Sequence, residues 1–292
     1  MDEKDWLILK ILAEKKSITK AAKILAISQP ALSNRLQQME TRFATPIVIR
    51  TQKGIHFTPE GDYLVEQARS YLSKMETVDN TINAMKGHIS GTLNIGSARF
   101  CSKYLLPDLL KSYKDKYPEI QFKVTSENSD TIFKMLYEDK IQLALVRGDY
   151  VWDQKVLLFE EDMYIGSNTP IKNFTDVAHH PFIEYVHNYY VKVELYKWWR
   201  SYFGDDPNIA IMVDDIDTAC ELVMRGLGWA FVSSWVLNRY RNLYTYPLTF
   251  KNGKPLTRKT WLLYTDNALK NKTVKSFFDF VCALDFSQHQ PQ

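Results

Sequence analysis

The segment from Ser28 to Gln37 carries short polar side chains at helical spacing. Leu32, Leu36 and Met39 recur at i, i+4 and i+7, which predicts the buried face of a helix. The opposite face then presents amides, a hydroxyl and a proline, from Gln29, Pro30, Ser33, Asn34 and Gln37. A recognition helix in a DNA major groove needs such a row of short polar side chains against the base edges.

Each of these side chains suits a particular contact with DNA. Gln29 can read an adenine with two hydrogen bonds, and Pro30 can lie against a thymine methyl group. Ser33 and Asn34 can bond bases or phosphates. Arg35 can meet a phosphate, a contact that positions a protein without reading the sequence. The alternative interpretation is a three-helix packing unit whose polar face is merely solvated.

Three short helices and a hairpin are expected to hold this face in place over residues 1–58. Thr19 can cap the second helix, and Ser28 can cap the third. Pro30 fits the first turn of the third helix, because its missing N–H would have no intrahelical partner there. Ser28, at the helix start, joins the candidate DNA-contacting residues.

The hairpin consists of two short predicted strands, 47–50 and 55–57. The turn between them contains Gly54, where a positive φ is needed. This arrangement places Arg50 and Lys53 for contact with the DNA backbone or the minor groove.

Lysine and arginine are concentrated near the N-terminus. Residues 1–58 hold ten Lys/Arg and five Asp/Glu, a balance of +5, whereas residues 59–292 sum to −2. A small basic module attached to a larger, slightly acidic one indicates that the N-terminal module binds a polyanion. The charge and the hairpin together favour double-stranded DNA as the partner over a solvated packing unit.

The rest of the composition is that of a folded protein expected in the cytoplasm. The 292 residues are 45% hydrophobic, and no apolar stretch reaches the ~18 residues of a membrane span. The charged N-terminus and the interruption of the apolar run 6–12 by Lys10 make a poor secretory signal. Cys101, Cys220 and Cys282 lack any C-x-x-C spacing, which predicts reduced packing residues.

A long helix is predicted from Pro59 to about residue 86. Apolar residues alternate along it at spacings of four and three, at Leu64, Ala68, Tyr71, Met75, Val78, Ile82 and Met85. One interpretation is a helix that lies on the larger domain. The other, favoured by the strict repeat, is a helix that pairs with a second copy of the chain.

From Thr92 onward, predicted strands and helices alternate. Strands are expected at 93–96, 120–125 and 143–146, and helices at 105–117 and 129–137. This alternation predicts a largely parallel α/β sheet with right-handed crossovers. A second α/β unit is expected over about 162–264, with strands near 209–213 and 229–233, and the final helix, 274–284, is expected to return to the first unit.

The N-terminal motifs resemble those of LysR-type transcriptional regulators. The resemblance lies in residues 17–33, SITKAAKILAISQPALS, in residues 47–51, IVIRT, and in residues 57–61, FTPEG. Ala26 departs from the Gly, His or Asn often found in the turn of this family, although an alanine fits a helical turn. The match is close over about the first 90 residues and architectural over the remainder.

This resemblance implies an α/β protein with an N-terminal all-α winged helix–turn–helix, a long linker helix, and a C-terminal effector domain of periplasmic-binding-protein type with two subdomains. The corresponding bounds are 1–58, 59–89 and 90–292, the last divided into 90–161 with 266–292, and 162–265. Members commonly pair through the linker helix, assemble as tetramers, bend promoter DNA and change that bend when an effector binds. RNA polymerase is a further candidate partner.

Ligands of open α/β sheets bind beyond the carboxyl ends of strands, near helix N-termini. Here such positions, together with the resemblance, give the candidate effector-binding residues Ser97, Arg99, Phe100, Ser129, Arg147 and Arg258. Arg147 and Arg258 resemble arginines that hold citrate carboxylates in citrate-responsive members. The expected effector is therefore a small anion, such as citrate or another di- or tricarboxylate. The alternative is that each arginine makes an internal ion pair or lies on the surface.

Two other classes of protein fit the sequence less well. A solute-binding protein for transport would share the α/β lobes, but it would need a signal peptide and no wing at 46–57. An enzyme would need a nucleophile–base set or a cofactor motif, and neither is present. The sequence therefore predicts a regulator with a small-molecule effector, without a metal or other cofactor.

Overall fold

The computed structural model describes residues 1–51, 54–85, 89–186 and 188–286. The chain divides into two compact units, Met1–His88 (unit 1) and Ile89–Gln292 (unit 2), and each is described by itself. No helix of the described ranges is long and apolar enough to cross a membrane.

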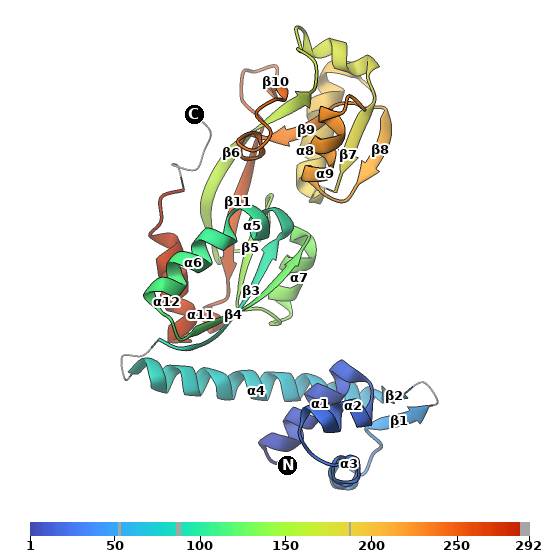
Figure 1. Ribbon diagram of the computed structural model, residues 1–292, viewed down its shortest axis with the longest axis vertical. Coiled ribbons are helices and arrows are strands. Elements are labelled where there is room, and N and C mark those ends of the chain that lie inside the picture. Colours follow the sequence, from blue (N-terminus) through green and yellow to red (C-terminus); the bar gives the residue numbers. More distant parts are fainter. Residues whose placement is uncertain (52–53, 86–88, 187, 287–292) are drawn as a thin grey trace. The chain divides into compact units, whose positions relative to one another are not determined.

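Unit 1 packs three helices against a two-stranded hairpin and the first half of a long helix (Figure 1). Its elements are α1 (Glu3–Lys15), α2 (Ile18–Ile24), α3 (Gln29–Phe43), β1 (Val48–Thr51), β2 (Gly54–Phe57) and α4 (Pro59–Met85). The predicted inward face of α3 is buried, with Leu32, Leu36 and Met39 each 2% exposed or less. These three side chains join one core cluster with α1, α2 and α4, which orients the opposite face of α3 to solvent.

The helix starts of unit 1 follow from hydroxyl caps. Ser28 Oγ accepts from the Ala31 N–H at 3.3 Å at the start of α3, as the sequence predicts. The cap of α2 is Ser17, two residues before the predicted Thr19, and its Oγ accepts from the Lys20 N–H. Ser17 is the capping residue because α2 already begins at Ile18. The Thr19 hydroxyl is therefore available to another partner.

The turn between α2 and α3 leaves the helical conformation at Ala26. Ala26 has φ 53°, in the left-handed region. A turn is predicted here, but its backbone is left-handed at Ala26 and is not the helical conformation that an alanine fits readily. A left-handed backbone brings Cβ close to the following carbonyl oxygen, which glycine avoids and asparagine tolerates.

The hairpin forms as predicted, with an antiparallel register that runs from Val48 opposite Phe57 to Thr51 opposite Gly54. Gly54 has φ 125°, and an added Cβ would lie 2.5 Å from the Lys16 carbonyl oxygen. Glycine is required here by both the backbone conformation and the close approach of α1. Lys53, predicted to contact DNA, lies outside the described residues.

Unit 2 has two lobes, visible in Figure 1. Lobe A contains β3 (Gly91–Ala98), α5 (Arg99–Tyr104), α6 (Leu106–Lys116), β4 (Ile120–Glu127), α7 (Ser129–Tyr137), β5 (Leu143–Arg147), α11 (Asp266–Leu269) and α12 (Lys272–Cys282). Lobe B contains a 3₁₀ turn (Phe174–His179), β7 (Phe182–Tyr185), α8 (Tyr189–Phe203), β8 (Ile209–Val213), α9 (Ile216–Met224), β9 (Ala230–Ser233), α10 (Ser234–Leu237) and β10 (Tyr244–Pro247). The strands β6 (Lys155–Ser167) and β11 (Thr257–Tyr264) connect the two lobes.

The sheet of unit 2 is mixed rather than largely parallel. Its order is β10-β6-β11-β5-β3-β4, with β9 also paired to β6. β3 is parallel to β4 and β5, as alternating strands and helices predict. β11 is antiparallel to both β5 and β6, because it carries the chain back to lobe A alongside the strand that left it. The chain therefore starts back toward lobe A at Thr257, the first residue of β11, whereas the return was predicted at residue 266.

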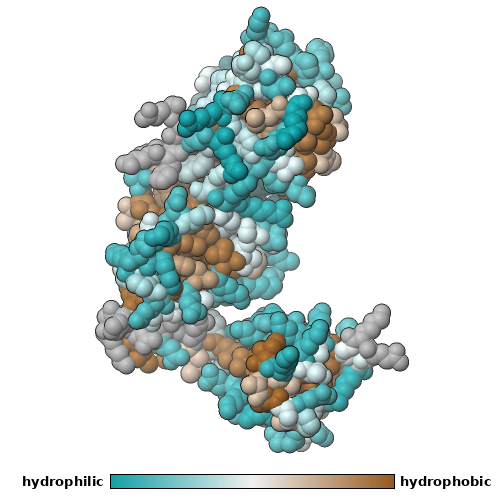
Figure 2. All heavy atoms as spheres, viewed as in Figure 1, coloured by the Kyte–Doolittle hydropathy of each residue, from teal (hydrophilic) through white to brown (hydrophobic). Residues whose placement is uncertain are grey.

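Several predicted elements of unit 2 also change in extent. The helix expected over 105–117 is observed as α6, and the short helix α5, just before it, was not predicted. The final helix is α12, and it packs on α6 and β3 of lobe A as expected. Cys101 and Cys220 are buried, whereas Cys282 is exposed at the end of α12 and is not a packing residue. Figure 2 shows a patch of hydrophobic side chains over the part of lobe A that holds α6, within a mainly hydrophilic surface.

Candidate nucleic-acid interface and effector cleft

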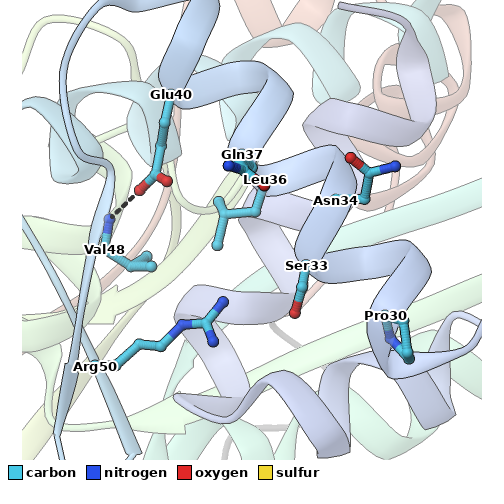
Figure 3. Close-up of a pocket in the computed structure, with 8 residues that line it drawn as sticks. All are labelled: Pro30, Ser33, Asn34, Leu36, Gln37, Glu40, Val48 and Arg50. Carbon is cyan, nitrogen blue, oxygen red and sulfur yellow. Dashed lines mark hydrogen bonds between the residues drawn. The ribbon is translucent and has the colours of Figure 1, made fainter.

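A groove of about 570 Å³ lies between α3 and the first strand of the wing (Figure 3). Its lining residues are Pro30, Ser33, Asn34, Leu36, Gln37, Glu40, Val48 and Arg50. Pro30, Asn34 and Gln37 are exposed, and Ser33 is half-buried. The structure thus brings together most of the polar residues predicted on the outer face of α3, with Arg50 directed toward them from β1.

Gln29 lies at the N-terminal end of the same face. Its side chain is exposed, and its Oε1 accepts a hydrogen bond from the Thr19 hydroxyl at 3.1 Å. This bond orients the Gln29 amide, so that its NH₂ group is available as a donor. Ser28 is also exposed, although its hydroxyl already caps α3. The sequence did not predict that Thr19 positions Gln29, because the Thr19 hydroxyl was expected to cap α2.

Arg35 is held within unit 1 rather than left free on the surface. Its guanidinium is 3.0 Å from an Asp2 carboxylate oxygen and 2.7 Å from an Asp5 carboxylate oxygen. Asp2 and Asp5 also form a capping box at the start of α1. The arginine predicted to meet a phosphate therefore joins α3 to α1 and fixes the angle between them.

Glu40 connects α3 to the wing, a function that the sequence alone did not suggest. Its Oε1 accepts from the backbone N–H groups of Ile47, at 2.8 Å, and Val48, at 3.3 Å (Figure 3). Thr58 secures the other end of the hairpin, because its hydroxyl donates to the Pro46 carbonyl oxygen at 2.8 Å. These bonds fix the width of the groove.

The apolar seam of α4 divides into two parts. Leu64 and Ala68 are buried in the core of unit 1 itself, an arrangement that neither sequence interpretation included. Farther along, Tyr71, Val78 and Ile82 are 38%, 48% and 47% exposed. The second half of the helix therefore presents an uncovered apolar stripe.

In unit 2, Arg147 lies among groups of both lobes. It is 1% exposed, and its guanidinium forms an ion pair with Glu161 of β6. It also donates to the Ser233 hydroxyl at 3.3 Å and lies 3.5 Å from the centre of the Phe100 ring. Burial and the neighbouring Arg258 lower the pKa of Arg147 well below its ordinary value.

Two further predicted residues, Arg258 and Ser129, join this buried cluster. Arg258 is 7% exposed and lies directly across from Glu161 in the pairing of β11 with β6. Tyr185 lies close to both arginines, and burial raises the pKa of its phenol against their attraction. Ser129 is buried, and its hydroxyl accepts from the Arg147 backbone N–H at 3.1 Å.

The other candidate effector residues lie at the end of β3 and the start of α5. Ser97 and Phe100 are buried near the cluster. Arg99 points away, because its half-exposed guanidinium pairs with Glu127 at 3.2 Å. Cys101 is fully buried close to both arginines, and burial raises the pKa of its thiol to about 11, so the thiol stays protonated.

Polar bridges join the lobes on either side of the buried cluster. Asn188 of lobe B donates to Asp130 at 2.6 Å and to the Tyr150 hydroxyl at 2.7 Å, both in lobe A or at its edge. On the other side, Asp217 at the start of α9 accepts from Lys103 at 2.8 Å and from the Tyr104 hydroxyl. Neither bridge was predictable from the sequence, because the residues of each bridge are distant along the chain.

A third partner of Asp217 is the Tyr240 hydroxyl, at 3.0 Å. Burial disfavours the charged carboxylate, but the bonds from Lys103, Tyr104 and Tyr240 outweigh burial and hold the pKa of Asp217 below its ordinary value. Within the described ranges, no group of three or more His, Cys, Asp or Glu side chains is placed to hold a metal ion.

Comparison with known proteins gives the family. Residues 4–62 match the bacterial regulatory helix-turn-helix proteins of the lysR family, and residues 86–284 match the LysR substrate binding domain. The chain is 35% identical to an uncharacterised HTH-type transcriptional regulator, YraN, of Bacillus subtilis (strain 168), over 96% of this chain and 97% of the relative. A second such regulator of that strain, YkuM, is 33% identical over 94% of each chain.

The fold is also that of a solved full-length regulator. The structure of CbnR complexed with its target DNA has a TM-score of 0.68 and 19% sequence identity, over 97% of this chain and 99% of that chain. The chain belongs to the LysR family of transcriptional regulators. It is a DNA-binding regulator with an effector-binding domain, and its relatives are regulators rather than enzymes.

Proposed function

We propose that this regulator binds promoter DNA through the groove between α3 and the wing. The observation that carries the proposal is the convergence of exposed amides and Arg50 on one open groove. The base-reading residues are Ser28, Gln29, Pro30, Ser33 and Asn34, joined by Gln37. Arg50 and Lys53 meet the DNA backbone, and Arg35 orients α3 from within unit 1. The CbnR structure, in which a protein of the same fold is complexed with its target DNA, supports this placement.

The regulator acts as a dimer or larger assembly in this proposal. The uncovered stripe of Tyr71, Val78 and Ile82 on α4 supplies one contact between copies. The hydrophobic patch around α6 supports a second contact, because exposed apolar patches mark interaction surfaces (Figure 2). A paired α4 would present two α3 helices to successive major grooves of a pseudo-palindromic operator.

Unit 2 senses a small anionic metabolite between its lobes and changes how unit 1 binds or bends DNA. Support comes from the two buried arginines, Arg147 and Arg258, where both lobes meet. Guanidinium groups suit carboxylates because two N–H groups match two oxygens. Ser97, Phe100 and Ser129 line the same region, whereas Arg99 pairs with Glu127 instead.

Two adjacent glutamines of α3 provide a matched test of the DNA interface. Gln37 lines the groove, whereas Gln38 is equally exposed but absent from the lining. We expect Gln37→Ala to weaken binding to a duplex from the gene's own upstream region by about 5- to 150-fold, measured by gel shift, because each specific base contact contributes about 1–3 kcal/mol. Gln38→Ala should bind like the native protein.

The salt dependence of binding provides a second readout. Arg50→Ala should weaken binding to specific and unrelated duplexes alike, and should reduce the slope of log affinity against log salt by about 1. Equal loss of affinity in the Gln37 and Gln38 variants, or native binding that does not respond to salt, would contradict the proposed interface.

A further inference from the structure

The buried cluster of unit 2 contains two positive charges and one negative charge. Arg147, Arg258 and Glu161 are 1%, 7% and 2% exposed. Glu161 forms its ion pair with Arg147. In the part of the chain that the structure describes, no carboxylate forms an ion pair with Arg258. Burial of a charge without a counter-ion costs several kcal/mol, so the cluster is one negative charge short.

Unused hydrogen-bonding groups lie next to that unpaired charge. Arg258 Nε and Thr260 Oγ1 are both buried and, among the described residues, have no hydrogen-bond partner. The two residues are two positions apart on β11, so their side chains lie on one face of the sheet. Thr260 is directly opposite Arg147 in the pairing of β11 with β5, which places all of these groups together.

We infer that this cluster binds one carboxylate of the effector at Arg258 and Thr260, and that Glu161 acts as a built-in carboxylate for Arg147. The inference rests on the proposed anionic effector and specifies its charge. The ligand carries a single carboxylate at this site. A second or third carboxylate would lie beside Glu161 and be repelled, which disfavours citrate and other polycarboxylates.

The closed position of the lobes is consistent with this inference. Asn188 and Asp217 each bridge the two lobes, and the cluster itself is buried, so that a ligand would reach it only when the lobes separate. A carboxylate bound at Arg258 would then replace the missing counter-ion and favour reclosure. The same ligand charge therefore serves both recognition and the conformational change.

A series of three acids tests the charge of the ligand on the full-length protein. Propanoate, succinate and citrate are compared in thermal unfolding at matched ionic strength, with sodium chloride as the baseline. We expect propanoate to raise the Tm of the native protein by at least about 2 °C, because a ligand that binds only the folded state stabilises it. Succinate and citrate should raise it by less than half as much.

Two substitutions should change the response to these acids in opposite ways. Propanoate should no longer raise the Tm of the Arg258→Gln variant. In sodium chloride the Tm of this variant should equal or exceed that of the native protein, because the substitution removes an unpaired buried charge. Glu161→Gln frees a second guanidinium, and it should bind succinate at least about 10-fold more tightly than the native protein does, by calorimetry. Arg200→Gln, at a surface ion pair with Asp206, is the control and should respond like the native protein.

Three results would overturn the inference. The first is a native protein whose Tm rises as much with succinate or citrate as with propanoate, or does not rise with any of the three acids. The second is an Arg258→Gln variant that propanoate still stabilises. The third is a Glu161→Gln variant that binds succinate no more tightly than the native protein does. Gel shifts with promoter DNA separate this failure from failure of the proposed regulator, since native DNA binding would persist when only the charge assignment is wrong.

Discussion

Arg147 and Glu161 form an ion pair that is almost completely removed from water. A buried pair adds little net stability relative to apolar residues, but loss of one partner leaves a buried charge uncompensated. The main role of Arg147 in this pair is therefore structural. Its guanidinium holds β5 to β6 and, through Ser233, holds lobe A to lobe B.

Arg147→Met should destabilise unit 2 by about 1–3 kcal/mol in urea unfolding, because Glu161 loses its ion pair with Arg147 and the Ser233 hydroxyl loses its donor. Six of the seven tryptophans lie in unit 2, so tryptophan fluorescence reports on this unit. The double variant Arg147→Met with Glu161→Gln should not regain this loss, because Arg258 is then buried in a cluster without a carboxylate. Arg99→Met, at a half-exposed pair, should cost at most about 1 kcal/mol. A similar cost for both arginines would contradict a buried counter-ion for Glu161.

Asp217 makes stability depend on pH. Its pKa is lowered in the folded protein, so its contribution is present above the unfolded pKa of about 3.9 and is lost as the pH falls through the folded value. Asp217→Asn should therefore lower the free energy of unfolding by about 1–2 kcal/mol at pH 7. The difference from the native protein should shrink steadily from pH 4 to pH 3.

The exposed Asp153 provides the comparison for Asp217. Asp153→Asn should stay within about 0.5 kcal/mol of the native protein at each pH. A loss for Asp217→Asn that is independent of pH would show that the carboxylate charge is not what binds Lys103 and the two tyrosines.

At the scale of elements, the junction of α2 and α3 combines good capping with one strained residue. Ser28 begins α3 with a side-chain cap, while Ala26 adopts the left-handed conformation just before it. The turn closes with a hydrogen bond from the Ile27 N–H to the Ala22 carbonyl oxygen at 3.1 Å. This bond and the core beneath it maintain a conformation that alanine disfavours.

Ala26→Gly should stabilise the helix–turn–helix by about 1 kcal/mol, because glycine adopts the left-handed conformation without the steric cost. Hydrogen exchange of peptides from residues 18–43 should slow accordingly. Ala31→Gly, within the first turns of α3, is the matched control and should speed exchange, because glycine lowers helix stability. Faster exchange in the Ala26 variant would exclude strain at this turn.

At the scale of the whole molecule, α4 links a DNA-binding unit to an effector-binding unit. Its first half belongs to the core of unit 1, through Leu64 and Ala68. Its second half leaves Tyr71, Val78 and Ile82 exposed along one side. An isolated apolar stripe of this kind is best explained by a second copy of the helix.

Val78→Asp and Ile82→Asp should each shift the protein toward smaller assemblies in light scattering after size exclusion, because a charge in the seam opposes pairing. DNA affinity should fall with them, since two linked half-sites bind more tightly than one. Ser73→Glu, on the other side of α4, is the control. Retention of the native mass by both seam variants would argue that copies associate elsewhere.

Much of unit 1 was predictable because its signals are local. Periodic leucines, a serine cap and a glycine turn each act within a few residues, and α3, the hairpin and the start of α4 form where these signals lie. The same holds for α7, predicted over 129–137 and observed from Ser129 to Tyr137. The family resemblance also rests on these local motifs.

The sequence by itself determined the family, the recognition helix and the order of most elements, since these depend on patterns within short segments. Only the tertiary structure decided which partner each charge takes. Arg35 pairs with Asp2 and Asp5, and Arg147 pairs with Glu161, because packing brings together segments that are far apart in the chain. An ion pair depends on distance in space and on exclusion of water, and no spacing along the chain encodes either.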